Sequence, residues 1–221
     1  MLKEIVIAAY DKSTDWLSEL NEEVKRTVYR KGDLIPLNKD EILIEPNLGR
    51  CVHTFFNHLY KNYNNLAEYT YFAQDYPFDH WGNIIDIINE DPLEMEKSAE
   101  LKIGGYYGYH NNTLGSSWAL SESQQFGNGG VLVCSSNGHP QDKNPLIDVD
   151  KYWGILFNEP KPINYEFMPG GHFCITRGQA QSRNRELYKK ITELLMEDVT
   201  APWMIERLEC YIFDTKYKTK W

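Results

Sequence analysis

The sequence predicts an α/β domain built on a parallel sheet. Two observations lead to this fold class. Residues 5–10 form a short, continuous apolar run, which is typical of a strand buried on both faces of a sheet. Further along, a helical pattern over 51–66 is followed by a β-type run over 69–73, and strand, helix, strand in this order implies a right-handed crossover between parallel strands.

The remaining elements follow in order from caps and periodicity. Polar residues 11–15 precede Trp16 and predict a turn that leads into a helix. We expect strands at 28–29 and 41–45, a helix over 51–66 with one buried stripe, and a helix over 81–88.

The second half is interrupted by glycine and asparagine, and we expect long loops between residues 91 and 142, with one buried strand at 130–134. Runs at 152–157 and 172–175 predict further strands. Two helices close the chain, over 186–196 and 202–213, the second starting at Pro202. We therefore expect one domain over 1–213 and a tail or linker over 214–221.

Length and composition fit a soluble globular protein. The chain has 221 residues, of which 42% are hydrophobic and 25% charged, and no apolar run approaches the length that spans a membrane. The formal net charge of -9 argues against nucleic acid or an anionic membrane as the main partner, because both favour basic patches. An anionic ligand would then require a metal ion or a local arginine.

Two features bear on the compartment. Residues 1–7 place a charge pair before a short β-type run, unlike a secretory signal. The four cysteines show neither a Cys-x-x-Cys pair nor zinc-ligand spacing, so we expect free thiols. Both features predict a cytoplasmic protein, located in the host cytoplasm if the protein is viral.

The acidic turn after the strand at 69–73 is the first candidate site. Asp75 and Asp79 flank Tyr76-Pro77-Phe78, and Pro77 keeps this backbone out of helix and ladder geometry. Carboxylates at the carboxyl edge of a sheet suit Mn²⁺ or Mg²⁺ bridging a diphosphate. The alternative is that either aspartate caps the helix that follows.

Other polar residues extend this candidate site. Arg50 follows Gly49 at a helix start, where backbone donors and a guanidinium can converge on an anion; a pair with a surface carboxylate is the alternative. His80 adjoins the acidic turn, and His172 opens a strand after two glycines, although a lone histidine is more often structural. Glu206 lies in a largely apolar helix and is a candidate general base, or else the partner of a neighbouring arginine.

Several common motifs are absent, and aromatic residues are frequent. The sequence has no P-loop, no Gly-x-Gly-x-x-Gly after a strand and no Gly-x-Ser-x-Gly, which disfavours P-loop hydrolysis, dinucleotide redox chemistry and serine esterase activity. Aromatic residues make up 14% of the chain. They are candidates either for stacking on sugar or base rings or for packing the domain; the stacking candidates are Tyr106, Tyr107, Tyr109, Trp118 and Trp153.

Four segments carry a resemblance to a known family: residues 5–11 (IVIAAYD), 47–50 (NLGR), 72–80 (FAQDYPFDH) and 202–213 (PWMIERLECYIF). They resemble the DUF3431-like, GT-A-type glycosyltransferases, and the chain is also similar to a glycosyltransferase domain at the amino terminus of a chlorella-virus protein implicated in capsid glycosylation. This resemblance implies a single GT-A domain with a mixed, mostly parallel sheet flanked by helices. It also implies a UDP-sugar donor, a glycan or glycoprotein acceptor, and Mn²⁺ or Mg²⁺ on a DxD-like motif.

The resemblance implies that Tyr10 and Asp11 contact the nucleoside, Arg50 the nucleotide, and Asp75 or Asp79 the metal. Taken with the candidates from the residues themselves, those for nucleotide or sugar binding are Ala8, Tyr10, Asp11, Asn47, Gly49, Arg50, Gln74, His80 and Gly171. The candidates for metal binding are Asp75, Asp79 and His172, and the candidate catalytic residues are Glu206 and Asp79. A literal Asp-x-Asp is absent, so which aspartate binds metal stays open.

The resulting hypothesis is transfer of glucose or a deoxyhexose such as rhamnose, with Glu206 taking the acceptor proton if the configuration inverts. Two alternatives remain. A metal-dependent nucleotide-sugar hydrolase would use the same carboxylates with water as the nucleophile. A non-catalytic carbohydrate-binding module would use the aromatic residues and would be indifferent to UDP.

Overall fold

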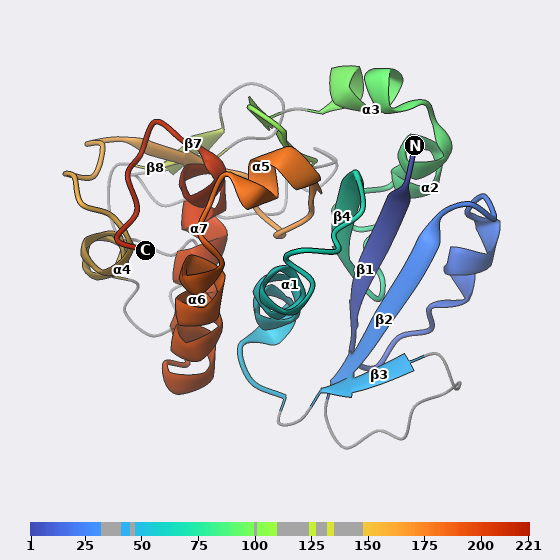
Figure 1. Cartoon of the computed structure of the whole chain (residues 1–221), viewed down its shortest axis with the longest axis horizontal. Helices are drawn as coiled ribbons and strands as arrows, with labels where there is room; N and C mark the ends of the chain where they lie inside the picture. The colour runs from blue at the N-terminus through green and yellow to red at the C-terminus, as the bar shows by residue number, and fades with distance from the viewer. Residues whose placement is uncertain (32–40, 45–46, 100, 110–123, 127–131, 135–147) are drawn as a thin grey trace.

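The computed structural model describes residues 1–31, 41–44, 47–99, 101–109, 124–126, 132–134 and 148–221, and within these ranges the chain is a mixed α/β fold (Figure 1). The large sheet has the spatial order β3 (Glu41–Ile44), β2 (Lys25–Lys31), β1 (Lys3–Ala9), β4 (Tyr69–Gln74), β10 (Phe173–Thr176), β6 (Tyr106–Gly108) and β5 (Leu101–Ile103). A smaller sheet contains β7 (Gln124–Phe126), β8 (Leu132–Cys134) and β9 (Tyr165–Phe167). The helices are η1 (Asp15–Glu19), α1 (Arg50–Lys61), α2 (Ile84–Asn89), α3 (Pro92–Ser98), α4 (Val149–Leu156), α5 (Arg177–Gln181), α6 (Arg185–Glu197) and α7 (Ala201–Phe213).

The large sheet is parallel in its first half and antiparallel in its second. β3, β2, β1 and β4 pair in parallel, as the strand, helix, strand order predicts. β10 then runs antiparallel to both β4 and β6, and β5 antiparallel to β6. The α/β class and the parallel pairing of the first strands are therefore confirmed, and the sheet as a whole is mixed.

The sheet is buried on both faces because apolar residues occupy both sides of its central strand. In β1, Val6 and Ala8 contribute to one core, and Ile5, Ile7 and Ala9 to the other. The first core lies against α1, α4, α6 and α7, and the second against η1, α2 and α3. A strand with this double burial reads as an unbroken apolar run, which is why sequence identified it.

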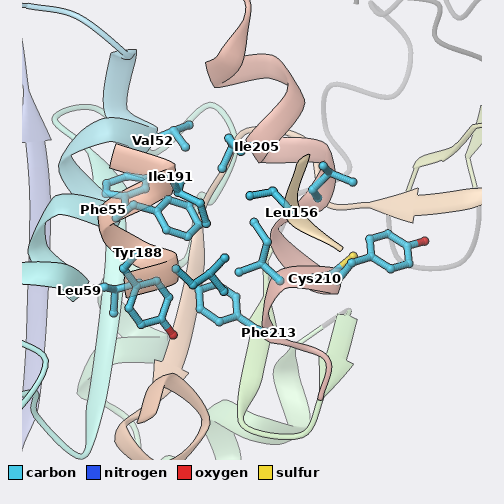
Figure 2. Packing of buried hydrophobic residues seen from close by; sticks show 14 of the residues in the cluster. Val52, Phe55, Leu59, Leu156, Tyr188, Ile191, Ile205, Cys210 and Phe213 are labelled. Atoms are coloured by element: carbon cyan, nitrogen blue, oxygen red, sulfur yellow. The ribbon is translucent and has the colours of Figure 1, made fainter. Parts of the chain in front are cut away.

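Aromatic rings and aliphatic side chains fill the first core between α1, α6 and α7. Figure 2 shows Val52 and Phe55 of α1 facing Ile191 of α6 and Ile205 of α7. In Figure 1, α1 lies between the parallel strands and the pair α6 and α7, with which it packs. This packing fixes where the amino terminus of α1 lies relative to α7.

Several sequence expectations about elements were wrong. Residues 152–157 belong to helix α4 rather than a strand; Asp148 caps it by accepting the backbone N–H of Lys151 at 2.9 Å. A short apolar run cannot be assigned to strand or helix by periodicity alone, and here the cap decides. The helix expected over 51–66 ends at Lys61, and the expected opening helix is the 3-10 turn η1.

The region expected to be long loops contains regular structure in its described parts. Asp91 caps α3 by accepting the N–H of Leu93 at 2.9 Å, and Pro92 starts that helix. β5 and β6 then form a hairpin whose turn holds Gly104 at φ 58°. The predicted strand at 130–134 is confirmed as β8 over its described residues, whereas Trp118 lies outside the described residues.

The tail after α7 folds back onto α4. The N–H of Asn158 donates to the carbonyl of Lys218 at 3.0 Å, and the N–H of Lys220 donates to that of Leu156 at 2.9 Å. The Tyr217 ring lies 5.3 Å from the Trp153 ring. These residues pack as part of the domain. Across the described ranges, every helix is too short or too polar to cross a bilayer.

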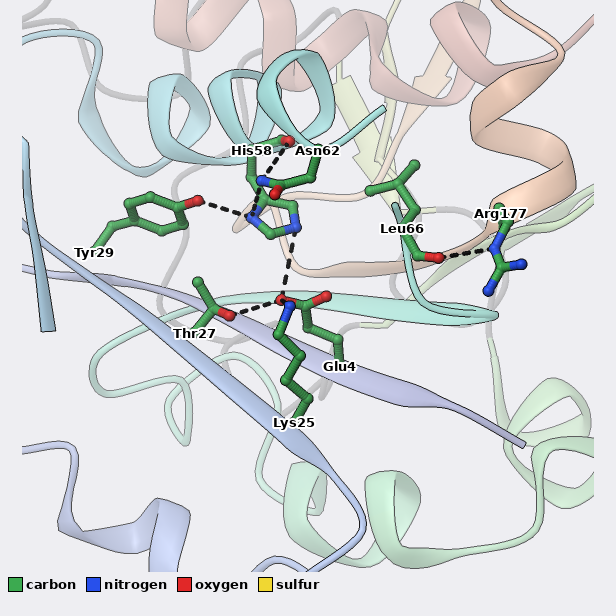
Figure 3. A network of polar contacts seen from close by, with 8 residues as sticks. All are labelled: Glu4, Lys25, Thr27, Tyr29, His58, Asn62, Leu66 and Arg177. Atoms are coloured by element: carbon green, nitrogen blue, oxygen red, sulfur yellow. Dashed lines mark hydrogen bonds and ion pairs between the residues drawn. The ribbon is translucent and has the colours of Figure 1, made fainter. Parts of the chain in front are cut away.

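A buried polar network joins β1, β2 and α1 (Figure 3). Glu4, which is 1% exposed, accepts a hydrogen bond from Thr27 at 2.6 Å and pairs with Lys25 at 2.9 Å. His58 of α1 lies 3.8 Å from Glu4 and bonds the hydroxyl of Tyr29 at 3.0 Å through Nδ1. Burial lowers the pKa of His58 to about 4, against the opposing effect of Glu4. At neutral pH the ring is therefore uncharged.

We predict that the protein loses stability as the pH falls from about 6.5 towards 4. Burial also lowers the pKa of His53 to about 4, with Lys31 and Lys61 acting in the same direction. In the unfolded chain both rings bind a proton near pH 6.5, so in this window the unfolded state binds more protons. His53→Gln should remove about 2 kcal/mol of the loss between pH 6.5 and 5, measured by urea denaturation. An unchanged slope in this variant would show that His53 is solvated.

Candidate functional site

A cavity of about 700 Å³ opens where β1, β2 and β4 end. Lys31 ends β2, Ala8 lies near the end of β1, and Gln74 ends β4. The opposite wall comes from the start of α1 and the first two turns of α7. β2 and β3 lie on one side of β1 and β4 on the other, so the strand order reverses here, which is where open α/β sheets bind ligands.

Most of the site residues predicted from sequence line this cavity. They come from distant segments and are Ala8, Tyr10, Asp11, Asn47, Arg50, Gln74, Asp75, His80 and Glu206. The other predicted residues lie outside the lining: Gly49, Asp79, Gly171 and His172. The sequence therefore located the sheet edge correctly, since strand ends bring these segments together.

The cavity also contains residues that the sequence analysis assigned no role. They are Lys31, Cys51, Val52, Phe167, Gly170, Pro202, Trp203 and Arg207. Pro202, Trp203 and Arg207 lie in the segment 202–213, which carries part of the family resemblance. That resemblance was the one feature of the sequence that could have identified them as site residues. Lys31 gave no signal, because its burial depends on the packing of the α1 loop against the end of β2.

The carboxylate of Asp75 binds backbone rather than pointing freely into the cavity. Oδ2 accepts the N–H groups of Tyr10 at 2.8 Å, Asp11 at 3.1 Å and Lys12 at 2.9 Å. Oδ1 accepts the N–H of Tyr76 at 3.0 Å, and the residue is only 8% exposed. Four donors use most of the acceptor capacity of a carboxylate. Asp75 therefore anchors the loop after β1 to the end of β4.

The three residues predicted to bind metal are not gathered into one group of ligands in the described part of the chain. Asp79 has a side chain that is 54% exposed and lies 3.8 Å from His80. His172 is 1% exposed, and its ring centre lies 5.6 Å from that of His80. Among the described residues, no group of three or more His, Cys, Asp or Glu is arranged to hold a metal ion. Since Asp75 is committed to N–H donors, these residues do not fit the Mn²⁺ or Mg²⁺ that the resemblance implies.

We predict that Asp75→Asn destabilises the protein in the presence of EDTA and without nucleotide. The substitution replaces an ionic acceptor of several buried N–H groups, so the free energy of unfolding should fall by about 2 kcal/mol or more. Asp79→Asn is the matched control and should change it by less than about 0.5 kcal/mol, since Asp79 is exposed. Chemical denaturation measures both. If Asp75 only bound a metal ion, Asp75→Asn would leave the free energy of unfolding in EDTA unchanged or would raise it.

The amino terminus of α1 contains two residues in the left-handed region. Gly49 has φ 69°, and Arg50 has φ 53°, which costs a residue with a Cβ about 1–3 kcal/mol. The buried ammonium of Lys31 donates to the carbonyl of Leu48 at 2.6 Å and also to that of Arg50. Among the described residues, no side chain caps the helix. Strain held in this way places the first turn of α1 at the cavity. Burial also lowers the pKa of Lys31 to about 8.

We predict that Gly49→Ala lowers the free energy of unfolding by about 2 kcal/mol or more. Its Cβ would lie 2.6 Å from Cβ of His53 and 2.8 Å from the carbonyl oxygen of Leu195, at a φ that disfavours alanine. Gly154→Ala in α4 is the matched control, because no described atom lies within 4 Å of its added Cβ. That variant should be unchanged or more stable by up to about 1 kcal/mol. Equal effects in urea titrations would contradict the tight fit at Gly49.

Glu206 projects from α7 to the cavity and is held by a glycine turn. Its Oε1 accepts the N–H of Gly170 at 2.9 Å. Gly170 has φ 95°, and a Cβ there would lie 3.1 Å from the His80 ring. Gly171, at φ 63°, continues this turn. Among the described residues, Glu206 forms no ion pair with Arg207, so the alternative of a pair with this arginine is wrong.

Two arginines converge on Trp203. The guanidinium of Arg50 lies 5.2 Å from the centre of its ring. The guanidinium of Arg207 donates a hydrogen bond to the backbone carbonyl of Trp203 at 2.8 Å and lies 4.8 Å from the centre of the Phe167 ring. Arg207 is 2% exposed, and its Nε has no hydrogen-bond partner within the described part of the chain. With Lys31 at the end of β2, three cations of the described residues line the cavity.

The aromatic residues expected to stack on sugar rings are mostly core residues. Tyr106 and Tyr109 are each 1% exposed, and Trp153 is 3% exposed. Trp81 stacks on Tyr109 at 4.3 Å between ring centres. The stacking prediction is therefore wrong for these side chains, and the aromatic excess mainly packs the domain. Tyr10, which is 53% exposed, is a flat side chain that does lie at the cavity.

A comparison with known families gives one result for nearly the whole chain. Residues 5–220 match DUF3431, described as a protein of unknown function. The chain belongs to the DUF3431 family. The resemblance to DUF3431 noted in the sequence is thereby confirmed. Neither the curated proteins nor the solved structures contain a match to the chain. Because the family description names no activity, the function of this DUF3431 protein must be argued from its site.

Proposed function

We propose that this DUF3431 protein is a GT-A-like glycosyltransferase that moves a sugar from a UDP-sugar to a glycan or glycoprotein acceptor. One observation carries the proposal. A cavity at the point where the strand order reverses combines an exposed aromatic ring, amide side chains, three cations and a half-buried carboxylate. These are the groups that a nucleotide-sugar needs at base, ribose, pyrophosphate and reacting carbon.

The nucleoside would bind at the sheet edge. Tyr10 offers its ring face for the uracil base, and the loop that carries it is held by Asp75. The side-chain amides of Asn47 and Gln74 face the same cavity and can exchange donors and acceptors with base and ribose. The pyrophosphate would then lie towards α1 and α7, where Arg50 is found.

Glu206 is the proposed general base. The acceptor hydroxyl oxygen forms a bond to the anomeric carbon, the bond from that carbon to the pyrophosphate oxygen breaks, and the hydroxyl proton passes to Glu206. UDP leaves with the bonding electron pair. The hydrogen bond from Gly170 fixes one carboxylate oxygen of Glu206. Asp79 lies outside the cavity lining, so its proposed catalytic role has less geometric support.

The donor sugar and the biological acceptor follow only from the resemblance. Glucose and a deoxyhexose such as rhamnose are the proposed donors, and viral capsid protein glycosylation is the proposed setting, which would place the protein in the host cytoplasm. The cavity lining contains no feature that separates these sugars.

We predict that the protein binds UDP at least about tenfold more tightly than GDP or CMP, with the Kd values measured by calorimetric titration. Glu206→Gln should keep UDP affinity within about twofold but reduce transfer from UDP-sugar by about 100-fold or more, because it removes the base and keeps the shape. Glu193→Gln on the exposed face of α6 is the matched control and should leave both unchanged. Chromatography of products from labelled UDP-sugar measures transfer.

Each contrary outcome has a clear meaning. Release of free sugar with no product on any acceptor would indicate the hydrolase. Glycan affinity that ignores UDP would indicate a carbohydrate-binding module. Equal affinity for all three nucleotides would contradict the proposal.

A further inference from the structure

We propose that protein cations, not a divalent metal, neutralise the pyrophosphate of the donor in this cavity. Arg207, Arg50 and Lys31 form the anion subsite, together with the amino terminus of α1. The inference rests on the proposed function for the identity of the ligand as a nucleoside diphosphate. The subsite itself rests on charge and burial.

Arg207 is the strongest element of this subsite. A guanidinium remains charged at all physiological pH values and is rarely buried without a counterion. Arg207 is nevertheless 2% exposed, lines the cavity and has a partnerless Nε, and no described carboxylate forms an ion pair with it. Within the described residues, its guanidinium contacts the carbonyl of Trp203 and the aromatic face of Phe167. An anion in the cavity would supply the missing charge.

Arg50 brings a second guanidinium to the same indole. The Trp203 ring contacts and orients the guanidinium of Arg50, and the backbone carbonyl of Trp203 accepts a hydrogen bond from Arg207. Trp203 therefore positions both arginines. Arg50 is exposed, and none of the described carboxylates forms an ion pair with it. Planar guanidinium groups match phosphate oxygens in geometry as well as charge.

The start of α1 completes the subsite. Within the described ranges no side chain caps this twelve-residue helix, and the lining includes its first three residues, Arg50, Cys51 and Val52. Uncapped N–H groups and the helix dipole favour an anion at this point. Lys31 lies beneath the same turn, bonded to the carbonyls of Leu48 and Arg50. The left-handed conformation of Arg50 is a strain of the kind found at ligand sites.

The carboxylates of the cavity do not cancel this charge. Asp75 is surrounded by four N–H donors, and Glu206 accepts the N–H of Gly170. Asp11 is exposed and lies 3.7 Å from Lys12. Asp11 and Asp75 lie at the sheet edge, whereas Arg50 and Arg207 belong to the helices across the cavity. Fixed cations on one wall would stabilise the charge that develops on departing UDP.

We predict that UDP and inorganic pyrophosphate bind in excess EDTA, and that adding Mn²⁺ changes the Kd of UDP by less than about threefold. Arg207→Met should weaken both ligands by about tenfold or more and leave uridine binding unchanged, because uridine has no phosphate. Calorimetry provides all the values. Since Arg207 is buried and its variant could unfold, Arg50→Met is the second variant, with the same expectation.

Arg185→Met is the matched control for Arg50→Met. Arg185 is also exposed and lies over an aromatic ring, that of Tyr60 at 4.6 Å, but it does not line the cavity. Its affinities should equal those of the unmodified protein.

The outcomes separate this inference from the proposed function. UDP binding that requires Mn²⁺ would overturn the cation subsite and leave a glycosyltransferase possible. Pyrophosphate binding that Arg50→Met weakens, with no preference for UDP among nucleotides, would support the subsite and contradict the proposed function. Unchanged affinity in the arginine variants overturns the subsite, and no binding of any phosphate ligand overturns both.

Discussion

The arrangement of the cavity depends on one buried carboxylate. Asp75 at the end of β4 gathers the N–H groups of Tyr10, Asp11 and Lys12, and so fixes the loop after β1. Trp16 adds to this junction by donating to the carbonyl of Asp75 at 2.8 Å. A hydrogen bond to an ionised acceptor is stronger than a neutral one, and several such bonds on one carboxylate lock a loop more firmly than packing alone. Without this junction the proposed nucleoside wall would have no fixed position.

The opposite wall depends on packing rather than on charge. α1 is held between the sheet and α6 by a continuous apolar core, and Gly49 fits against Leu195 with no room for a side chain. The ammonium of Lys31 then holds the strained turn in place by donating hydrogen bonds to the carbonyls of Leu48 and Arg50. The buried network of Glu4 and His58 fastens the other end of α1 to β1 and β2. A helix secured at both ends can hold an uncapped, strained first turn at the cavity, because its remaining contacts offset that local cost.

Sequence predicted the parts of the molecule that local pattern determines. β1, α1, β4, α6 and α7 were found because each has a long apolar pattern or a clear start signal, such as Pro202 for α7. α4 was missed because its apolar run fits strand and helix equally, and its cap Asp148 lies outside that run. At the site, strand ends predicted which segments meet. The role of Asp75 could not be predicted, because its donors are about 65 residues away, and neither could the burial of Arg207, which arises when α7 packs beside β9.

The overall acidity of the chain does not describe its cavity. A formal net charge of -9 suggests a surface that repels phosphate, and this led to the expectation of a metal ion or a local arginine. The anion subsite proposed above takes the second of these. Burial, with Glu206 acting in the same direction, raises the pKa of Glu209 well above its usual range, which favours the neutral form of this carboxyl and weakens its repulsion of an anion. Asp75 is compensated by backbone dipoles. When burial and hydrogen bonding are taken into account, Arg50 and Arg207 on the α1 and α7 wall, with Lys31 beneath the first turn of α1, outnumber Glu206. A local excess of cations can therefore coexist with an acidic protein, because distant surface carboxylates are screened by salt over about 8–10 Å.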